Sequence, residues 1–147
     1  MKYFKKTELI KCFRENKQDR CAGCKLTKAV NRLPNGIEAA LEALAVNVLD
    51  PAREILGRPI YVTSGFRCPF YNNAVGGVRN SQHILGEAAD ICVMNDNQNE
   101  NEKLAQIIEA NGKYDQLIRY MGADGKIRFI HVSWKRLGPN RKQIIYK

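Results

Sequence analysis

Two histidines and one aspartate are the residues of this sequence whose types could together hold a metal ion. His83 and Asp90 lie seven positions apart, and His131, the second of only two histidines, lies far downstream in the stretch 127–134. A catalytic zinc site uses three protein ligands with nitrogen or oxygen donors and leaves the fourth position to water. Two imidazoles and one carboxylate meet this requirement, and zinc in such a site activates water for hydrolysis. Iron, cobalt or manganese would also suit these ligands.

Spacing alone leaves a plainer interpretation open. A histidine and an aspartate seven residues apart are a weak signal, since the histidines could be unrelated and the aspartate could cap a helix. In favour of a metal site, Gly86 lets the backbone turn between the two groups, and the small Ala88 and Ala89 allow close packing. If Asp90 and His131 lie on neighbouring strands, all three groups converge.

The elements that must position these groups follow from the periodicity of the sequence. Apolar residues recur at helical spacing from Ile37 to about Leu56, and Asp50-Pro51 predicts either a kink or a second helix capped by Asp50. Residues 64–67 are expected to form a tight turn and residues 123–126 a hairpin turn. Further helices are predicted at 69–74 and 102–110, and strands at 60–63, 89–94, 116–120, 127–134 and 143–146.

These elements predict an α+β fold with a small, largely antiparallel sheet and helices on one side. We expect a single domain over residues 1–147, with a loop-rich arm at 1–36, a core that carries the candidate zinc site at 37–134 and a basic segment at 135–147. No run of eighteen apolar residues and no secretory signal are visible, so we expect no membrane span and a cytoplasmic location at synthesis. A monomer is expected.

Charge and cysteine content narrow the classes of function. The net charge of +9 and the pI of about 9.5 favour attraction to a polyanion, either nucleic acid or an anionic cell wall. Nucleic acid ranks last because no helix-turn-helix or stacking motif is present. Five cysteines, an odd number, argue against a disulfide framework. Cys21 and Cys24 form a lone Cys-x-x-Cys with only Cys12 nearby, so we expect free thiols rather than a four-ligand zinc knuckle.

A longer series of motifs resembles a known family. Ser-Gly-Phe-Arg at 64–67, Asn73 and Gly76-Gly77 precede Ser-x-His-x-x-Gly-x-Ala-x-Asp at 81–90, and a late His-Val-Ser begins at 131. This order, spread over residues 37–134, resembles the zinc D-alanyl-D-alanine carboxypeptidase family, which includes dipeptidases, bacteriophage endolysins and the hedgehog-type fold. The resemblance implies a hedgehog/DD-peptidase-like fold and hydrolysis of peptidoglycan peptides that contain D-amino acids. It also suggests a phage enzyme released to the cell wall at lysis.

The resemblance also implies roles for individual residues. His83, Asp90 and His131 match the zinc ligands of the family. Arg67 matches an arginine that binds substrate and stabilises the oxyanion, although a surface salt bridge is the simpler alternative. Ser81 matches a serine that contacts substrate.

The sequence departs from this family at the general base. The acid expected shortly before the second histidine is absent, because Arg128 stands three residues before His131. Asp115, which precedes a strand expected beside His131, is the candidate base, and a strand-start cap is the alternative. Glu87 is expected to point away on a surface turn, and Tyr120 is a candidate substrate contact. The missing acid also favours a second hypothesis, a zinc-containing module that binds cell-wall peptide without cutting it.

Overall fold

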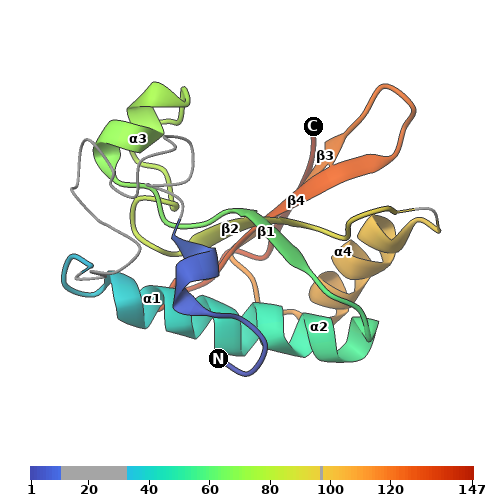
Figure 1. Ribbon diagram of the computed structural model, residues 1–147, viewed down its shortest axis with the longest axis horizontal. Coiled ribbons are helices and arrows are strands. Elements are labelled where there is room, and N and C mark those ends of the chain that lie inside the picture. Colours follow the sequence, from blue (N-terminus) through green and yellow to red (C-terminus); the bar gives the residue numbers. More distant parts are fainter. Residues whose placement is uncertain (11–32, 97) are drawn as a thin grey trace.

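A five-stranded sheet organises the fold, which the computed structural model describes for residues 1–10, 33–96 and 98–147 (Figure 1). The strands are β1 (Tyr61–Ser64), β2 (Ala88–Cys92), β3 (Gln116–Met121), β4 (Ile127–Ser133) and β5 (Gln143–Tyr146). They lie in the order β1-β2-β4-β3-β5, and only the β3–β5 pair within this sheet is parallel. The predicted α+β fold with a largely antiparallel sheet is therefore confirmed, with one parallel edge pair that the sequence did not predict.

Most helical residues lie along one side of this sheet. The described helices are η1 (Lys6–Leu9), α1 (Ile37–Leu44), η2 (Ala45–Leu49), α2 (Asp50–Leu56), α3 (Pro69–Ala74) and α4 (Glu100–Asn111). The segments α1, η2 and α2 follow one another as one long rod beneath the sheet, and α4 packs beside α2 (Figure 1). The short α3 lies away from this rod.

Pro51 explains an irregularity within the rod. Proline lacks the N–H group that would close a helical hydrogen bond, and its ring crowds the carbonyl group four residues earlier. The turn before it widens into a π-helix over Ala45–Leu49, which lets the helix continue. The expectation of a separate helix capped by Asp50 is wrong. The Asp50 carboxylate instead accepts hydrogen bonds from the backbone N–H groups of Lys2 and Tyr3, at 2.6 and 3.0 Å.

Within the first ten residues, Phe4, Leu9 and Ile10 belong to the hydrophobic core. Leu9 and Ile10 are fully buried against the sheet and the rod. Burying a leucine or isoleucine side chain contributes about 1.5–3 kcal/mol, so this segment adds to the stability of the domain. The predictions for Cys12, Cys21 and Cys24 concern residues outside those that the structure describes.

The segment after β1 is extended, which corrects the prediction of a tight turn at 64–67. The Phe66 N–H group donates to the Leu9 carbonyl oxygen at 2.7 Å, and Ile10 and Phe66 form a parallel bridge. A side chain at Gly65 could not fit, because its Cβ would lie 2.2 Å from the Leu9 carbonyl oxygen. The segment therefore runs past the end of β1 and brings the Arg67 side chain to Asp90 on the neighbouring β2. The hairpin turn expected at 123–126 is present, with Gly125 at φ 74°.

Candidate metal centre

Three donor atoms from three parts of the chain meet on one face of the sheet. Asp90 on β2 and His131 on β4 are direct partners in the antiparallel register, so strand pairing places them side by side. His83 reaches them from the loop between α3 and β2. Its Nε2 lies 3.2 Å from both Asp90 Oδ1 and His131 Nδ1, which are 2.9 Å apart. The convergence expected from the sequence is present.

The geometry of these donors fits a zinc ion. Zinc–ligand bonds of about 2.0–2.2 Å in a tetrahedron separate the donor atoms by about 3.3–3.6 Å, only slightly more than the distances here. His83 Nδ1 lies 2.8 Å from the Gly65 carbonyl oxygen, which can accept a hydrogen bond but cannot donate one. Nδ1 therefore carries the hydrogen, and Nε2 presents its lone pair to the other two residues. Three electron-rich atoms at this separation repel one another unless a cation or a shared proton lies between them.

The protonation states of the site also suit a cation. Burial raises the pKa of Asp90, but its close contacts with His131 and His83 outweigh burial and hold this pKa well below its usual range. Burial lowers the pKa of His131, which favours its neutral form. An ionised carboxylate and neutral imidazoles are the forms that bind zinc.

Arg67 lies against the candidate ligands rather than on the open surface. Its Nη2 donates to Asp90 Oδ2 at 2.7 Å, and its Nε donates to Ser64 Oγ at 2.7 Å. The guanidinium thus fixes the carboxylate oxygen that does not face the histidines, in the manner of groups that orient metal ligands. Ser81 lies at the other side of His83, where its hydroxyl oxygen accepts from the His83 N–H group at 3.4 Å.

A cleft of about 740 Å³ opens over the three donors, a size typical of binding sites for small ligands. The donors, Ser81 and the Arg67 side chain all line it. Its other charged lining residues are Glu87, Lys135, Arg141 and Lys147, and its aromatic and larger aliphatic ones are Leu85, Ile118, Tyr120, Phe129 and Ile145. Tyr120 and Phe129 are cross-strand partners whose rings stack with centroids 4.3 Å apart. The cleft therefore combines a metal-type donor set with an apolar wall and several cations.

Asp115, the predicted general base, is committed to other contacts. Its carboxylate is fully buried and accepts hydrogen bonds from the backbone and the guanidinium of Arg141, and from Gln82 Nε2 at 2.9 Å. Burial raises the pKa of Asp115, but these hydrogen bonds outweigh burial and hold the pKa well below its usual range. The role of Asp115 as a base remains a prediction, and these contacts weigh against it, since a strongly stabilised carboxylate accepts a proton poorly.

Glu87 lies where the sequence did not place it. We expected its side chain on a surface turn pointing away, whereas the structure puts Glu87 on the cleft wall. The turn depends on Gly86, whose φ is 69°, a conformation that favours glycine. Burial raises the pKa of Glu87. The glycine was visible in the sequence, but it indicates only that the chain turns and not toward which side.

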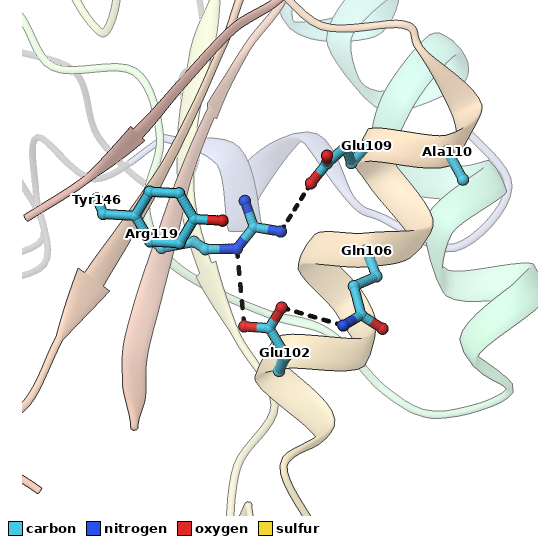
Figure 2. Close-up of a pocket in the computed structure, with 6 residues that line it drawn as sticks. All are labelled: Glu102, Gln106, Glu109, Ala110, Arg119 and Tyr146. Carbon is cyan, nitrogen blue, oxygen red and sulfur yellow. Dashed lines mark hydrogen bonds and ion pairs between the residues drawn. The ribbon is translucent and has the colours of Figure 1, made fainter. Parts of the chain in front are cut away.

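The opposite face of the sheet carries a second polar cluster. Figure 2 shows the Arg119 side chain leaving β3 toward α4, between Glu102 and Glu109 and beside the ring of Tyr146. Arg119 Nη2 lies 2.8 Å from Glu109 Oε2, and its Cζ lies 5.0 Å from the centre of the Tyr146 ring. Arg119 is only 1% exposed. Opposite charges pair in this cluster and hold the sheet to α4, although Arg119 Nε and Nη1 have no hydrogen-bond partner among the described residues.

Comparisons with known proteins bear on this geometry. The family model described as Peptidase M15 matches residues 2–133, which include all three donors, Arg67 and Ser81. No curated protein matches the chain at a significant level. Among the described residues, no helix is both long and apolar enough to cross a bilayer.

Proposed function

Because this chain belongs to the peptidase M15 family, which is of the zinc D-Ala-D-Ala carboxypeptidase type, we propose that it hydrolyses D-amino-acid-containing peptides of bacterial peptidoglycan. It would act as a DD-carboxypeptidase or as an endolysin-type endopeptidase. The observation that carries the proposal is the convergence of His83, Asp90 and His131 at the floor of a peptide-sized cleft.

Each residue around the cleft has a distinct role in the proposed hydrolysis. His83, Asp90 and His131 would hold a zinc ion, which would supply Lewis-acid polarisation of the scissile carbonyl and would lower the pKa of water from about 15.7 to about 7. The Gly65 carbonyl oxygen holds His83 in the tautomer that carries its hydrogen on Nδ1 and leaves the Nε2 lone pair free for a metal ion. Arg67 orients Asp90, and its guanidinium lies on the cleft wall, where it can donate to a developing oxyanion. Ser81 lines the same cleft and can contact the peptide.

The charge of the protein suits this substrate. Peptidoglycan peptides end in a carboxylate, and cell walls carry net negative charge. A net charge of +9 draws such a surface toward the protein, and basic side chains line the cleft itself. The same charge would attract nucleic acid, but the cleft holds a donor set for a metal and has no row of aromatic platforms for bases.

Two acidic residues, Asp115 and Glu87, are candidates for the general base, and an experiment can distinguish them. Asp115 is the residue that the sequence favours, but it is held by Arg141. Glu87 lines the cleft, and burial raises its pKa, whereas the pKa of Asp115 is lowered, so Glu87 is the stronger base of the two. Glu87→Gln should lower kcat by about 100-fold or more if Glu87 is the base. Asp115→Asn should do so only if Asp115 is.

The proposal is tested by hydrolysis. Zinc-loaded protein is incubated with purified peptidoglycan and with peptides that end in D-Ala-D-Ala, and the products are identified by mass spectrometry. Release of terminal D-alanine indicates a carboxypeptidase, whereas cleavage within the stem or cross-link indicates an endopeptidase and fits a phage lysis role. His83→Ala should bind no zinc and cut neither substrate. Absence of turnover by folded, zinc-loaded protein on both substrates would reject the enzymatic proposal.

A second function, a peptide-binding module that does not cut, is favoured by one observation. The position three residues before His131 holds Arg128, an exposed cation that cannot serve as a base. This function predicts measurable affinity for peptidoglycan peptides by calorimetry, with zinc bound and no product formed over hours. A strong fall of turnover in Glu87→Gln or Asp115→Asn would exclude it.

A further inference from the structure

The C-terminal strand β5 forms one wall of the cleft, although it lies beyond the residues that match the family. Alternation along β5 turns Ile145 and Lys147 toward the cleft. It turns Tyr146 to the opposite face, where the ring lies against Arg119 (Figure 2). Tyr146 thus anchors the strand from behind, while Ile145 and Lys147 line the cleft.

The backbone fixes the position of Lys147. Its N–H group donates to the Arg119 carbonyl oxygen at 3.0 Å, and its carbonyl oxygen accepts from the Met121 N–H group at 2.7 Å. These bonds extend the β3–β5 pairing by one residue and set Lys147 beside Tyr120. The Lys147 ammonium lies 5.8 Å from the centre of the Tyr120 ring, within the range of a cation–π contact.

Lys147 is a cation on the cleft wall that has no carboxylate partner among the described residues. Arg67 is paired with Asp90. Arg141 and Lys135 are both paired with the buried Asp115 carboxylate. Within residues 1–10, 33–96 and 98–147, no carboxylate lies within ion-pair distance of the Lys147 ammonium.

The strand register gives the distance from Lys147 to the metal centre. His131 pairs with Ile118 on β3, and Ile118 pairs with Ile145 on β5, two residues before Lys147. Two strand spacings and two residues along a strand place the Lys147 backbone roughly 12 Å from that of His131. An extended peptide covers this distance in roughly three residues.

We propose that Lys147 and the Tyr120 ring form a carboxylate-binding subsite that selects peptides carrying an acidic group two or three residues from the bond that is cut. The ammonium supplies the charge, and the ring stacked on Phe129 provides an apolar floor for the aliphatic part of the acidic residue. The inference rests on the proposed function, because it assumes that a peptide lies in the cleft with its reacting bond at the metal centre.

The carboxylate could belong to a side chain or to the end of the peptide, and matched peptides separate these sources. One pair carries glutamate or glutamine three residues from the expected cut. The other pair ends at that distance in a free carboxylate or a carboxamide. Affinity is measured by calorimetry with the zinc-loaded protein, and kcat and KM are measured where turnover occurs. In wild-type protein the acidic member of at least one pair should bind about 5- to 10-fold more tightly than its neutral partner.

Lys147→Gln should abolish this preference. It should raise the Kd and KM of the acidic peptide about 5- to 10-fold, leave kcat unchanged and leave the neutral peptide unaffected. Lys113→Gln removes the same charge from an exposed site outside the cleft and should change neither value. Equal effects of Lys147→Gln on acidic and neutral peptides, or no preference in wild-type protein, would overturn the inference. Because affinity is read separately, loss of turnover alone would count against the enzymatic proposal and not against this subsite.

Discussion

On one face of the sheet His83, Asp90 and His131 turn three electron-rich atoms toward one point, whereas on the other face Arg119 lies among Glu102, Glu109 and Tyr146. The candidate metal donors come from β2, β4 and the loop before β2, whereas the Arg119 cluster comes from β3, β5 and α4. Both clusters bury charged or polar groups. The Arg119 cluster is held by pairs of unlike charges. The histidine cluster brings three electron-rich atoms together, which a cation or a shared proton would hold. This difference separates a structural cluster from a functional one more clearly than burial does.

The largest expected effect comes from removing one of the three candidate metal donors. Asp90→Ala should abolish stoichiometric zinc binding and lower peptidase activity by more than about a thousandfold, because several kcal/mol of transition-state stabilisation are lost. Metal analysis of the purified variant and the hydrolysis assay check both results. Asp124→Ala, which removes an aspartate from the exposed hairpin, should retain metal and activity. Full zinc occupancy in Asp90→Ala would show that the three donors do not form the site.

Substitutions in the Arg119 cluster should lower the stability of the fold and leave metal binding unchanged. Arg119→Ala removes a buried side chain and its contact with the Tyr146 ring, so the free energy of unfolding should fall by about 3 kcal/mol. Arg119→Met keeps the apolar stem, and the partly exposed glutamates can hydrate, so its loss should be only about 1 kcal/mol. Urea denaturation measures these values, with the exposed Arg128→Ala as control. Zinc loss in Arg119→Met would contradict the independence of the two faces.

Removing the metal from wild-type protein should have the next largest effect. A ligand present at about 100 times its Kd stabilises the folded state by about 2.7 kcal/mol. At this chain length the corresponding fall in Tm after chelation is roughly 5–10 °C. Thermal scans with and without chelator give the shift. His131→Ala should show no shift, since its site is already incomplete, and a shift of similar size in that variant would place the metal elsewhere.

The smallest effect concerns Asp115, which pairs with Arg141, a residue that lines the cleft. Its pKa in the folded protein lies below the usual value of about 3.9, so its charge stabilises the fold above that pH. This contribution is lost as the pH falls below about 4 toward the folded-state pKa. Asp115→Asn should therefore cost about 2 kcal/mol at neutral pH and flatten the acid-induced loss of stability.

Urea denaturation across a series of pH values measures that profile. Glu42→Gln, at an exposed position on α1, should leave the profile unchanged. If Asp115→Asn shows the same decline in acid as wild-type protein, another carboxylate governs it.

The metal donors could be predicted from the sequence, but their surroundings could not. Asp90 and His131 each lie on a strand with a recognisable pattern, so pairing of those strands was enough to bring them together. The partners of Asp115 were not visible, because Arg141 lies 26 residues away and reaches it only after β5 adds to the sheet. The segment at 64–67 appeared turn-like because of its glycine. Only the structure reveals that the glycine makes room for Leu9.

A single peptide unit, between Gly65 and Phe66, connects the N-terminal segment at Leu9 with His83 in the candidate metal centre. The carbonyl oxygen of Gly65 holds the His83 ring, and the bare α-carbon admits the Leu9 backbone, which in turn is bonded to Phe66. A displacement of the Leu9 backbone would therefore shift the Gly65–Phe66 peptide unit and, with it, the His83 ring.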